Sequence, residues 1–259
     1  LFAQRKNLPV EQVVDVAPIT GTFTYSAVVG DSAPDIFRAT VARYLKMGFV
    51  DFKLKLSGDS IRDHQKIDTF RDLKDVKNIR VRIDANNLWE DADTAAHYLE
   101  DLDFSFAGIE EPLAANAIDG MRLVAERLGG PIILDESLLR AEQLAPLAKD
   151  PDTWVVNVRV SKMGGLLRSL AVIKAVRDLG LALIVGAQVG ETSVLTRAGL
   201  VVAHAGRNVL FAQEGAFGTH LLKEDVAAPS LMFNASGVLD SDSYALSRKT
   251  GWGLTVHRK

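Results

Sequence analysis

The sequence has no cysteine, and that absence removes several kinds of chemistry at once. Disulfides, thiolate nucleophiles and zinc sites built on cysteine are all excluded. No apolar run reaches the roughly 18 residues that a membrane-spanning helix needs, and no secretory signal peptide is evident. We therefore expect a soluble, cytoplasmic protein without a membrane partner.

A strong excess of one charge is lacking too. The 30 Lys and Arg residues nearly balance the 33 Asp and Glu residues, giving a net charge of −3, so no basic surface argues for nucleic acid. The G-x-G-x-x-G motif of dinucleotide-binding folds is also absent. A hydrophobic content of 47% is enough for a sizeable core, and 259 residues fit a single barrel domain.

Short β-rich runs alternate with helix-like stretches along the chain. The stretches 33–47, 94–102, 165–179 and 193–205 place apolar residues at helical spacing. Strand alternating with helix implies a parallel sheet, and eight such units fit a closed barrel. We therefore predict an α/β fold, a TIM-type (β/α)7β barrel, with strands over Thr22–Gly30, Val50–Ser57, Arg80–Asn86, Phe106–Leu113, Pro131–Leu138, Val155–Ser161, Leu181–Gln188 and Asn208–Gly215.

Charged and apolar residues alternate along several of these strands. The strand over 80–86 reads RVRIDAN, and the strands over 50–57 and 155–161 follow the same pattern. The apolar faces should meet the surrounding helices, so the charged side chains should point into the barrel, where branched aliphatic residues are usual. A paired internal salt-bridge network and a functional site would each explain them.

Three acidic residues lie near the C-terminal ends of successive predicted strands: Asp84, Glu110 and Asp135. Equivalent positions on neighbouring strands, about 4.8 Å apart, converge at one mouth of a barrel. Close carboxylates repel one another unless a cation intervenes, and oxygen-only ligands suit Mg²⁺, with Mn²⁺ as an alternative. We predict that these three residues bind a divalent metal, although a single strand-end acid more often caps a helix. By alternation, Glu111 and Glu136 should face away from the ligands and either support them from behind or pack in the interior.

Basic residues on two other strands complete the predicted site. Lys53 and Lys55 are two residues apart, and an ammonium crowded by other cations loses proton affinity, which favours a role as a base. The alternative is that both are counter-ions of the carboxylates. Arg159 stays protonated, so it is suited to binding a substrate anion or stabilising negative charge. Lys162 is either functional or a surface lysine at a helix start.

Several motifs together resemble the enolase superfamily, and within it the muconate lactonizing enzyme (mandelate racemase/muconate cycloisomerase) subgroup. They are K-x-K, D-A-N, E-E-P and D-E-S on predicted strands two to five, and S-K-x-G-G after strand six. The segments VGAQVGETS, EGAFGTHLL and KTGWGLTV also look like that subgroup. The resemblance covers essentially the whole chain.

The resemblance implies a Mg²⁺-dependent isomerase or lyase acting on a small carboxylic-acid substrate. Such an enzyme removes the proton α to the carboxylate and forms a metal-stabilised enolate. Lys55 would be the base, and Lys53 would adjust its proton affinity and stabilise the substrate carboxylate. Three residues are expected at the substrate: Glu191, Gln188 and Phe217.

Arg159 departs from the subgroup, many members of which have lysine at this position. A racemase or epimerase needs a base on each face of its substrate, and arginine is a poor base. We therefore rank cycloisomerisation or syn-elimination above racemisation or epimerisation of an amino acid or dipeptide, with Arg159 and Lys162 counted among the catalytic residues. A metal-binding barrel that has lost catalysis is a further alternative. A phosphate-binding barrel, with Gly215 and Gly218 as its only hints, ranks last.

The resemblance also implies an N-terminal α+β capping domain, which we expect to be largely absent from this chain. Leu1–Val14 reads as the tail of a helix that belongs to an upstream region. We predict that residues 1–14 are a remnant of the capping region or linker, 15–228 the catalytic barrel and 229–259 a C-terminal segment. A homo-oligomer is expected, and the substrate is not readable from the sequence.

Overall fold

The structure is a computed structural model of the chain, and it describes residues 1–73 and 78–257. Its main sheet has eight parallel strands in the order of the chain, β2-β3-β4-β5-β6-β7-β8-β9. A helical segment follows each strand from β2 to β8 before the next strand begins. This repetition is that of a TIM-type barrel, as the sequence predicts.

By its internal contacts the chain divides into two compact units. Unit 1 contains Leu1–Tyr25, Arg140–Ala145 and Val158–Lys259, and unit 2 contains Ser26–Leu139 and Pro146–Asn157. Each unit has its own strands and helices, and each is described separately below.

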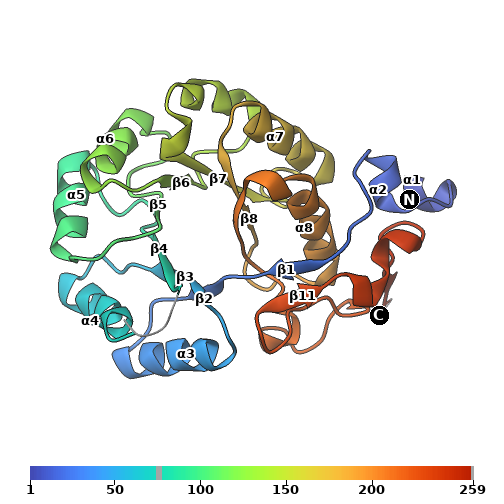
Figure 1. The fold of residues 1–259 in the computed structure, drawn as a ribbon, viewed down its shortest axis with the longest axis horizontal. Coiled ribbons are helices and arrows are strands. Elements are labelled where there is room, and N and C mark those ends of the chain that lie inside the picture. The colour runs from blue at the N-terminus through green and yellow to red at the C-terminus, as the bar shows by residue number, and fades with distance from the viewer. Residues whose placement is uncertain (74–77, 258–259) are drawn as a thin grey trace. The chain divides into compact units, whose positions relative to one another are not determined.

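Unit 2 holds a run of parallel strands with helices along their outer side (Figure 1). Its strands are β2 (Ala27–Val29), β3 (Asp51–Lys55), β4 (Arg80–Asp84), β5 (Gly108–Glu110), β6 (Ile132–Leu134) and most of β7 (Trp154–Arg159). Its helices are α3 (Pro34–Lys46), α4 (Ser60–Arg71), α5 (Ala92–Asp101) and α6 (Ile118–Leu128). Two 3-10 segments lie between β6 and β7: η1 (Ala141–Lys149), whose residues up to Ala145 belong to unit 1, and η2 (Pro151–Thr153).

The apolar side of β3 packs against the helices that flank it. Phe52 is fully buried, and its ring meets that of Phe70 on α4 edge-on, with centroids 5.2 Å apart. Phe37 of α3 meets the same Phe70 ring at 6.5 Å. Each such side chain contributes about 1.5–3 kcal/mol on burial. Because strand residues alternate, this packing leaves Lys53 and Lys55 on the opposite side of β3.

Unit 1 combines the last barrel strands with four short strands and the N-terminal helices. Its strands are β1 (Thr22–Thr24), β8 (Ala182–Gly186), β9 (Leu210–Gln213), β10 (Ala227–Ala228), β11 (Val238–Asp240) and β12 (Thr255–Val256). Its helices are α1 (Phe2–Arg5), α2 (Val10–Val13), α7 (Leu166–Asp178) and α8 (Ser193–Ala205), with the 3-10 segments η3 (Arg207–Val209), η4 (Gly218–His220), η5 (Asp242–Tyr244) and η6 (Leu246–Arg248).

Two predictions about the N-terminal part of the chain are wrong in detail. The run Thr22–Gly30 is not one strand, because β1 pairs antiparallel with β11 whereas β2 pairs parallel with β3. Leu1–Val14 is not one helix, because α1 and α2 are separated at Asn7, whose φ of 54° is left-handed, and at Pro9, which caps α2. Neither residue continues a helix readily.

A buried ion pair joins α2 to α8 within unit 1. Arg197 and Glu11 are both fully buried and pair directly. Arg197 Nε also donates to the carbonyl of Trp252 at 2.8 Å, and Ser247 Oγ donates to Glu11 at 3.0 Å. The pair therefore connects the N-terminal helices, α8 and the C-terminal segment.

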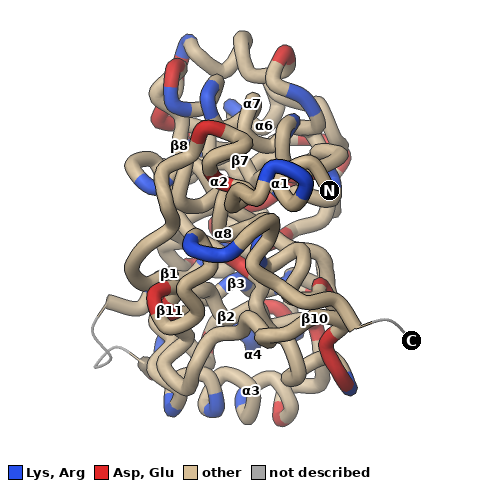
Figure 2. Tube along the Cα trace, turned by 90° about the vertical axis from the view of Figure 1, so that its right-hand side faces the viewer, with Lys and Arg blue, Asp and Glu red and all other residues tan. Residues whose placement is uncertain are grey.

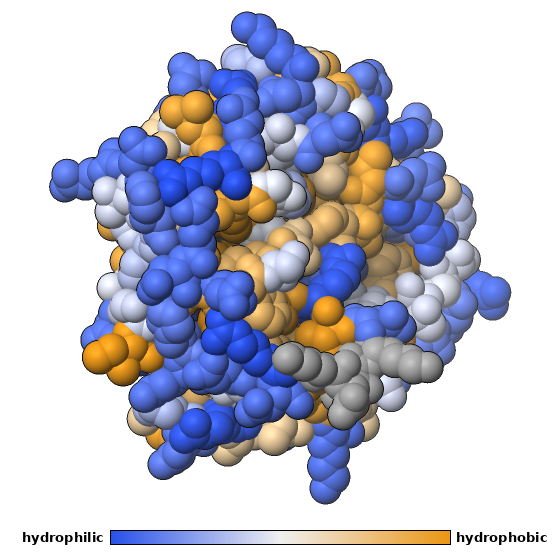
Figure 3. Space-filling view, turned by 60° about the vertical axis from the view of Figure 1, so that its left-hand side comes forward, coloured by the Kyte–Doolittle hydropathy of each residue, from blue (hydrophilic) through white to orange (hydrophobic). Residues whose placement is uncertain are grey.

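Charges of both signs are interspersed along the part of the chain that the structure describes (Figure 2). On the face shown in Figure 3, hydrophilic side chains predominate, and apolar side chains gather in a hollow near its middle. Among the described residues, no helix has the length and apolar character needed to cross a bilayer.

Replacing Arg197 by Met should destabilise the protein by about 3–5 kcal/mol, because Glu11 would stay buried without its counter-ion. Urea unfolding followed by circular dichroism would measure the change. Arg168→Met on the exposed side of α7 is the matched control and should change the free energy of unfolding little. Equal effects of the two substitutions would contradict a stabilising role for the pair.

Candidate functional site

The predicted base and two predicted metal ligands lie at one level of three neighbouring strands. The Cα partner of Lys55 on β4 is Asp84, and the partner of Asp84 on β5 is Glu110. Partners in a parallel sheet project to the same side, so these three side chains share one face at the C-terminal ends of their strands.

Asp135 does not occupy the equivalent position that the sequence analysis gave it. The partner of Glu110 on β6 is Ile133, and Asp135 lies two residues further along the chain. Strands in a barrel are staggered, so equal spacing in the sequence does not give equal height. The period of two still leaves Asp135 on the face of Ile133. Asp84, Glu110 and Asp135 are 9%, 1% and 5% exposed, so all three carboxyl groups are buried.

Lys53 lies between two of these acids. Its Nζ is 3.1 Å from Glu110 Oε2 and 3.9 Å from Asp84 Oδ2. Asn157 Nδ2 donates to Glu110 Oε1 at 3.0 Å. Burial raises the pKa of Asp84, and the positive charges of Lys53 and Lys55 oppose that rise. Lys53 therefore acts at least as the counter-ion that the sequence analysis allowed.

Ion pairing also accounts for other inward charges of unit 2. Arg82 is fully buried, and its Nη2 is 2.9 Å from Asp51 Oδ1 and 2.7 Å from Ser26 Oγ. Arg80 Nη2 lies 2.9 Å from the other oxygen of Asp51. Part of the alternating charge is thus an internal salt-bridge network, and the acids nearer the strand ends remain to be explained.

The donor chemistry of those acids fits a hard divalent cation, since all are buried carboxylates. In the conformation shown, no three His, Cys, Asp or Glu side chains among the described residues are grouped closely enough to hold a metal. Two of the three predicted ligands are instead turned toward the Lys53 ammonium, which neutralises part of their charge. The assignment of Asp84, Glu110 and Asp135 as ligands therefore stays a prediction.

Glu111 supports a predicted ligand from behind, which is one of the two roles that the sequence analysis allowed it. It is fully buried, and its Oε1 accepts hydrogen bonds from the backbone N–H groups of Asp135 and Ser137, both at 2.7 Å. Its Oε2 accepts from Ser137 Oγ at 2.8 Å. Burial raises the pKa of Glu111, and these hydrogen bonds oppose the rise. Glu111 thereby fixes the segment that carries Asp135, a role that the doubled acid of E-E-P could have signalled.

Three predicted residues of unit 1 form a connected group with Ser161. Arg159 Nη1 donates to Gln188 Oε1 at 3.0 Å, and the Gln188 N–H donates to Glu191 Oε1 at 2.9 Å. Ser161 Oγ lies 3.4 Å from the same Glu191 oxygen. Burial raises the pKa of Glu191, and the hydrogen bond from the Gln188 N–H, together with that from Ser161 and the charge of Arg159, opposes the rise. The end of β7 and the loop after β8 are thus joined through their polar side chains.

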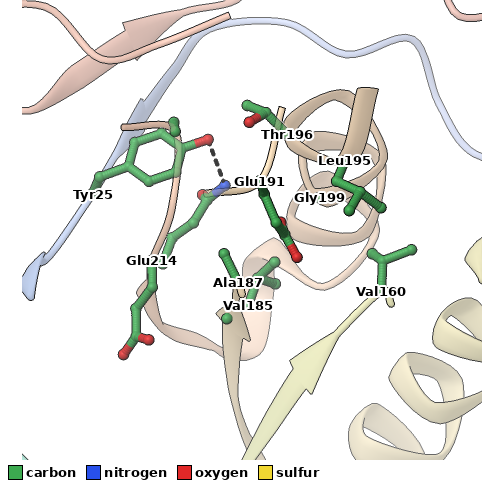
Figure 4. Close-up of a pocket in the computed structure, with 12 residues that line it drawn as sticks. Tyr25, Val160, Val185, Ala187, Glu191, Leu195, Thr196, Gly199 and Glu214 are labelled. Atoms are coloured by element: carbon green, nitrogen blue, oxygen red, sulfur yellow. Dashed lines mark hydrogen bonds between the residues drawn. The ribbon is translucent and has the colours of Figure 1, made fainter. Parts of the chain in front are cut away.

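Glu191 also lines a small cavity of about 10 Å³, shown in Figure 4. Tyr25, Thr196 and Gln213 line it as well, and Gln213 Nε2 donates to the Tyr25 hydroxyl at 3.0 Å. Burial raises the pKa of Tyr25 far above its ordinary range. The volume suits about one water molecule and is too small for a substrate.

The last two predicted residues lie elsewhere in unit 1. Lys162 is half-buried in the turn between β7 and α7. Phe217 directly precedes η4, and its ring meets that of Phe233 edge-on at 5.0 Å. The structure therefore gives Phe217 an aromatic packing contact, and its role at a substrate stays a prediction.

Comparison with known proteins gives relatives that include epimerases, a racemase and an o-succinylbenzoate synthase. A hydrophobic dipeptide epimerase from Enterococcus faecalis is 24% identical over 81% of this chain and 58% of its own length. The L-Ala-D/L-Glu epimerase from Bacillus subtilis is 26% identical over 98% of this chain and 67% of its own length. The chain thus spans between about half and two thirds of the length of such curated relatives.

Solved structures show the same fold. The E. faecalis dipeptide epimerase, complexed with Mg and the dipeptide L-Leu-L-Tyr, has a TM-score of 0.82 and 21% identity over 99% of this chain and 69% of that chain. Muconate lactonizing enzyme from Pseudomonas putida has a TM-score of 0.83 and 24% identity over 98% of this chain and 69% of that chain. Residues 37–259, most of the chain, match the family described as enolase C-terminal domain-like. The protein is therefore a member of that family, within the enolase superfamily.

Proposed function

We propose that this protein is a Mg²⁺-dependent enzyme that removes the proton α to the carboxylate of a small acid, and that it is a racemase or epimerase. The observation that carries the proposal is the common level of Lys55, Asp84 and Glu110 on β3, β4 and β5. The relatives that are epimerases support inversion over the cycloisomerisation or elimination that the sequence alone favoured.

Lys55 and Lys53 are suited to different tasks. Lys55 is exposed at the end of β3, so its amine is accessible to a substrate. Lys53 is buried and paired with Glu110, so its charge is committed to the carboxylates. We therefore assign proton abstraction to Lys55, and to Lys53 the task of keeping positive charge beside the acids.

Asp84, Glu110 and Asp135 would hold the metal, and Mn²⁺ would suit the same oxygen donors. When bound, Mg²⁺ would supply a Lewis acid for the substrate carboxylate. Dipeptides are the first substrates to examine, because the E. faecalis relative was solved with one. Glu191, Gln188 and Phe217 are the residues proposed to contact the substrate.

Inversion requires a second group that exchanges a proton on the other face of the substrate. Arginine stays protonated, so Arg159 is better suited to binding an anionic part of the substrate than to accepting a proton. Lys162 is the remaining predicted residue able to serve as the second base.

One-base chemistry, meaning cycloisomerisation or syn-elimination, is the second candidate, and it rests on the arginine at position 159. The stereochemistry of labelling separates the two. In D₂O, a two-base enzyme places deuterium at the α-carbon of the inverted product, whereas one base exchanges the proton with retention or eliminates.

Lys55→Ala should lower the rate of α-proton exchange by about 10²–10⁴-fold, because it removes the general base. The exchange would be followed by NMR in D₂O with Mg²⁺ and L-Leu-L-Tyr, and with a panel of other dipeptides and N-acylamino acids. Lys46→Ala, an exposed lysine on α3, is the matched control and should exchange at the wild-type rate. Undiminished exchange in Lys55→Ala would refute its assignment.

Glu110→Gln should weaken Mg²⁺ binding by at least about tenfold, because an amide replaces a charged oxygen donor. Isothermal titration calorimetry with Mg²⁺ alone would measure the affinity, with circular dichroism to establish folding. Asp119→Asn removes an exposed carboxylate of α6 and should leave the affinity unchanged. Wild-type affinity in Glu110→Gln would rule out Glu110 as a ligand.

A further inference from the structure

A buried ammonium from α4 contacts the backbone of Lys55. Lys66 Nζ donates to the Lys55 carbonyl oxygen at 2.8 Å. It also lies 2.8 Å from Asp63 Oδ1 and 2.8 Å from Asp31 Oδ1. The Lys66 side chain is 2% exposed, and an ammonium has three protons to donate. All three are therefore engaged, and one of them holds the residue that we propose as the base.

Lys66 supplies this hydrogen bond where the strand ladder stops. The pairing of β2 with β3 ends with Val29 opposite Leu54, one residue before Lys55. A polar backbone group removed from water without a partner costs about 1–3 kcal/mol. Asp31, just beyond the end of β2, holds Lys66 from the other side. The ammonium thus connects the ends of two strands to α4.

Asp63 fixes the turn that follows Lys55. It is fully buried, and it accepts hydrogen bonds from Ser57 N–H at 3.0 Å, Ser57 Oγ at 2.8 Å and Gly58 N–H at 3.0 Å. Tyr98 OH donates at 2.8 Å to Asp63 Oδ2, the oxygen that also accepts from Gly58 N–H. Burial alone would raise the pKa of Asp63, but the hydrogen bonds from Lys66, Ser57 and Tyr98 hold it below its ordinary value. Asp63 therefore stays charged at neutral pH.

The backbone on both sides of Lys55 is consequently held, although its own side chain is exposed. Lys55 is the last residue of β3, and the Leu56 N–H donates to the carbonyl of Asp84 at 3.0 Å. A flexible lysine side chain reaches a reacting carbon reproducibly only when its backbone does not move. A displacement of about 1 Å at a reacting group can cost about 10²-fold in rate.

We propose that Lys66, fixed by Asp63 and Asp31, is a positioning residue that sets the place of Lys55 in the reaction. The inference rests on the proposed function of Lys55 as the base. Lys66 itself is buried against the backbone and acts through Lys55, without contact with the substrate.

The test compares Lys66→Met with wild type in α-proton exchange, using Mg²⁺ and the best substrate of the panel. Because the base would be misplaced and substrate binding left intact, kcat should fall by about 10–100-fold while KM changes less than about twofold. Arg122→Met is the matched control, since Arg122 is also a cation paired with two aspartates, Asp119 and Asp150, although it is only partly buried. It should lose stability without losing kcat.

A second measurement does not depend on activity. Hydrogen–deuterium exchange of the peptide that contains Ser57 and Gly58 should be faster in Lys66→Met, and unchanged in Arg122→Met. Should Lys66→Met fail to fold, Lys66→Gln, which keeps a donor without the charge, undergoes the same two measurements.

Wild-type kcat in the folded Lys66 variant would overturn the proposal, as would an equal loss in Arg122→Met. If wild type shows no exchange on any substrate, the proposed function fails, and the amide measurement decides the positioning role alone. Faster amide exchange limited to the Lys66 variant would then support the role, and unchanged protection would overturn it.

Discussion

Buried negative charge is the constraint on which the arrangement of this site depends. Asp84, Glu110, Glu111 and Asp135 are all at most 9% exposed, and carboxylates withdrawn from water remain charged only beside positive charge or hydrogen-bond donors. The first three meet that requirement in two ways. Lys53 lies beside Asp84 and Glu110, whereas backbone N–H groups and a serine hydroxyl satisfy Glu111.

Because buried carboxylates need positive charge nearby, three lysines that look alike in the sequence have different roles. Lys53 and Lys55 are two residues apart on one face of β3, yet only Lys53 is buried against the acids. Lys66, on the helix that follows, is engaged with Asp63, Asp31 and a backbone carbonyl. The three lysines thus divide into a counter-ion, an accessible amine and a buried hydrogen-bond donor.

The chemistry of Arg159 and the activities of the epimerase relatives favour different reactions. A permanently protonated side chain argues against a second base at that position, whereas the E. faecalis and B. subtilis relatives are epimerases. Its hydrogen bond to Gln188, which in turn donates to Glu191, fits a residue that orders polar groups around an anion. Inversion then requires another group such as Lys162.

The sequence by itself determined the order of the strands, the faces of β3 and β4 and the family. These follow from local rules, since alternation with a period of two and short motifs need no knowledge of distant contacts. It also predicted Lys55, Asp84 and Glu110 as neighbours, because they end consecutive parallel strands.

Only the tertiary structure decided the height of Asp135, the partner of Lys53, the division of Thr22–Gly30 and the contacts of Lys66. Strand stagger is a property of the whole sheet, so it displaced Asp135 by two residues from the level of Glu110. The split at residues 25–26 depends on a pairing with β11, more than 200 residues away in the chain. Lys66 has no motif, and its function follows only from the three oxygens that folding brings to its ammonium.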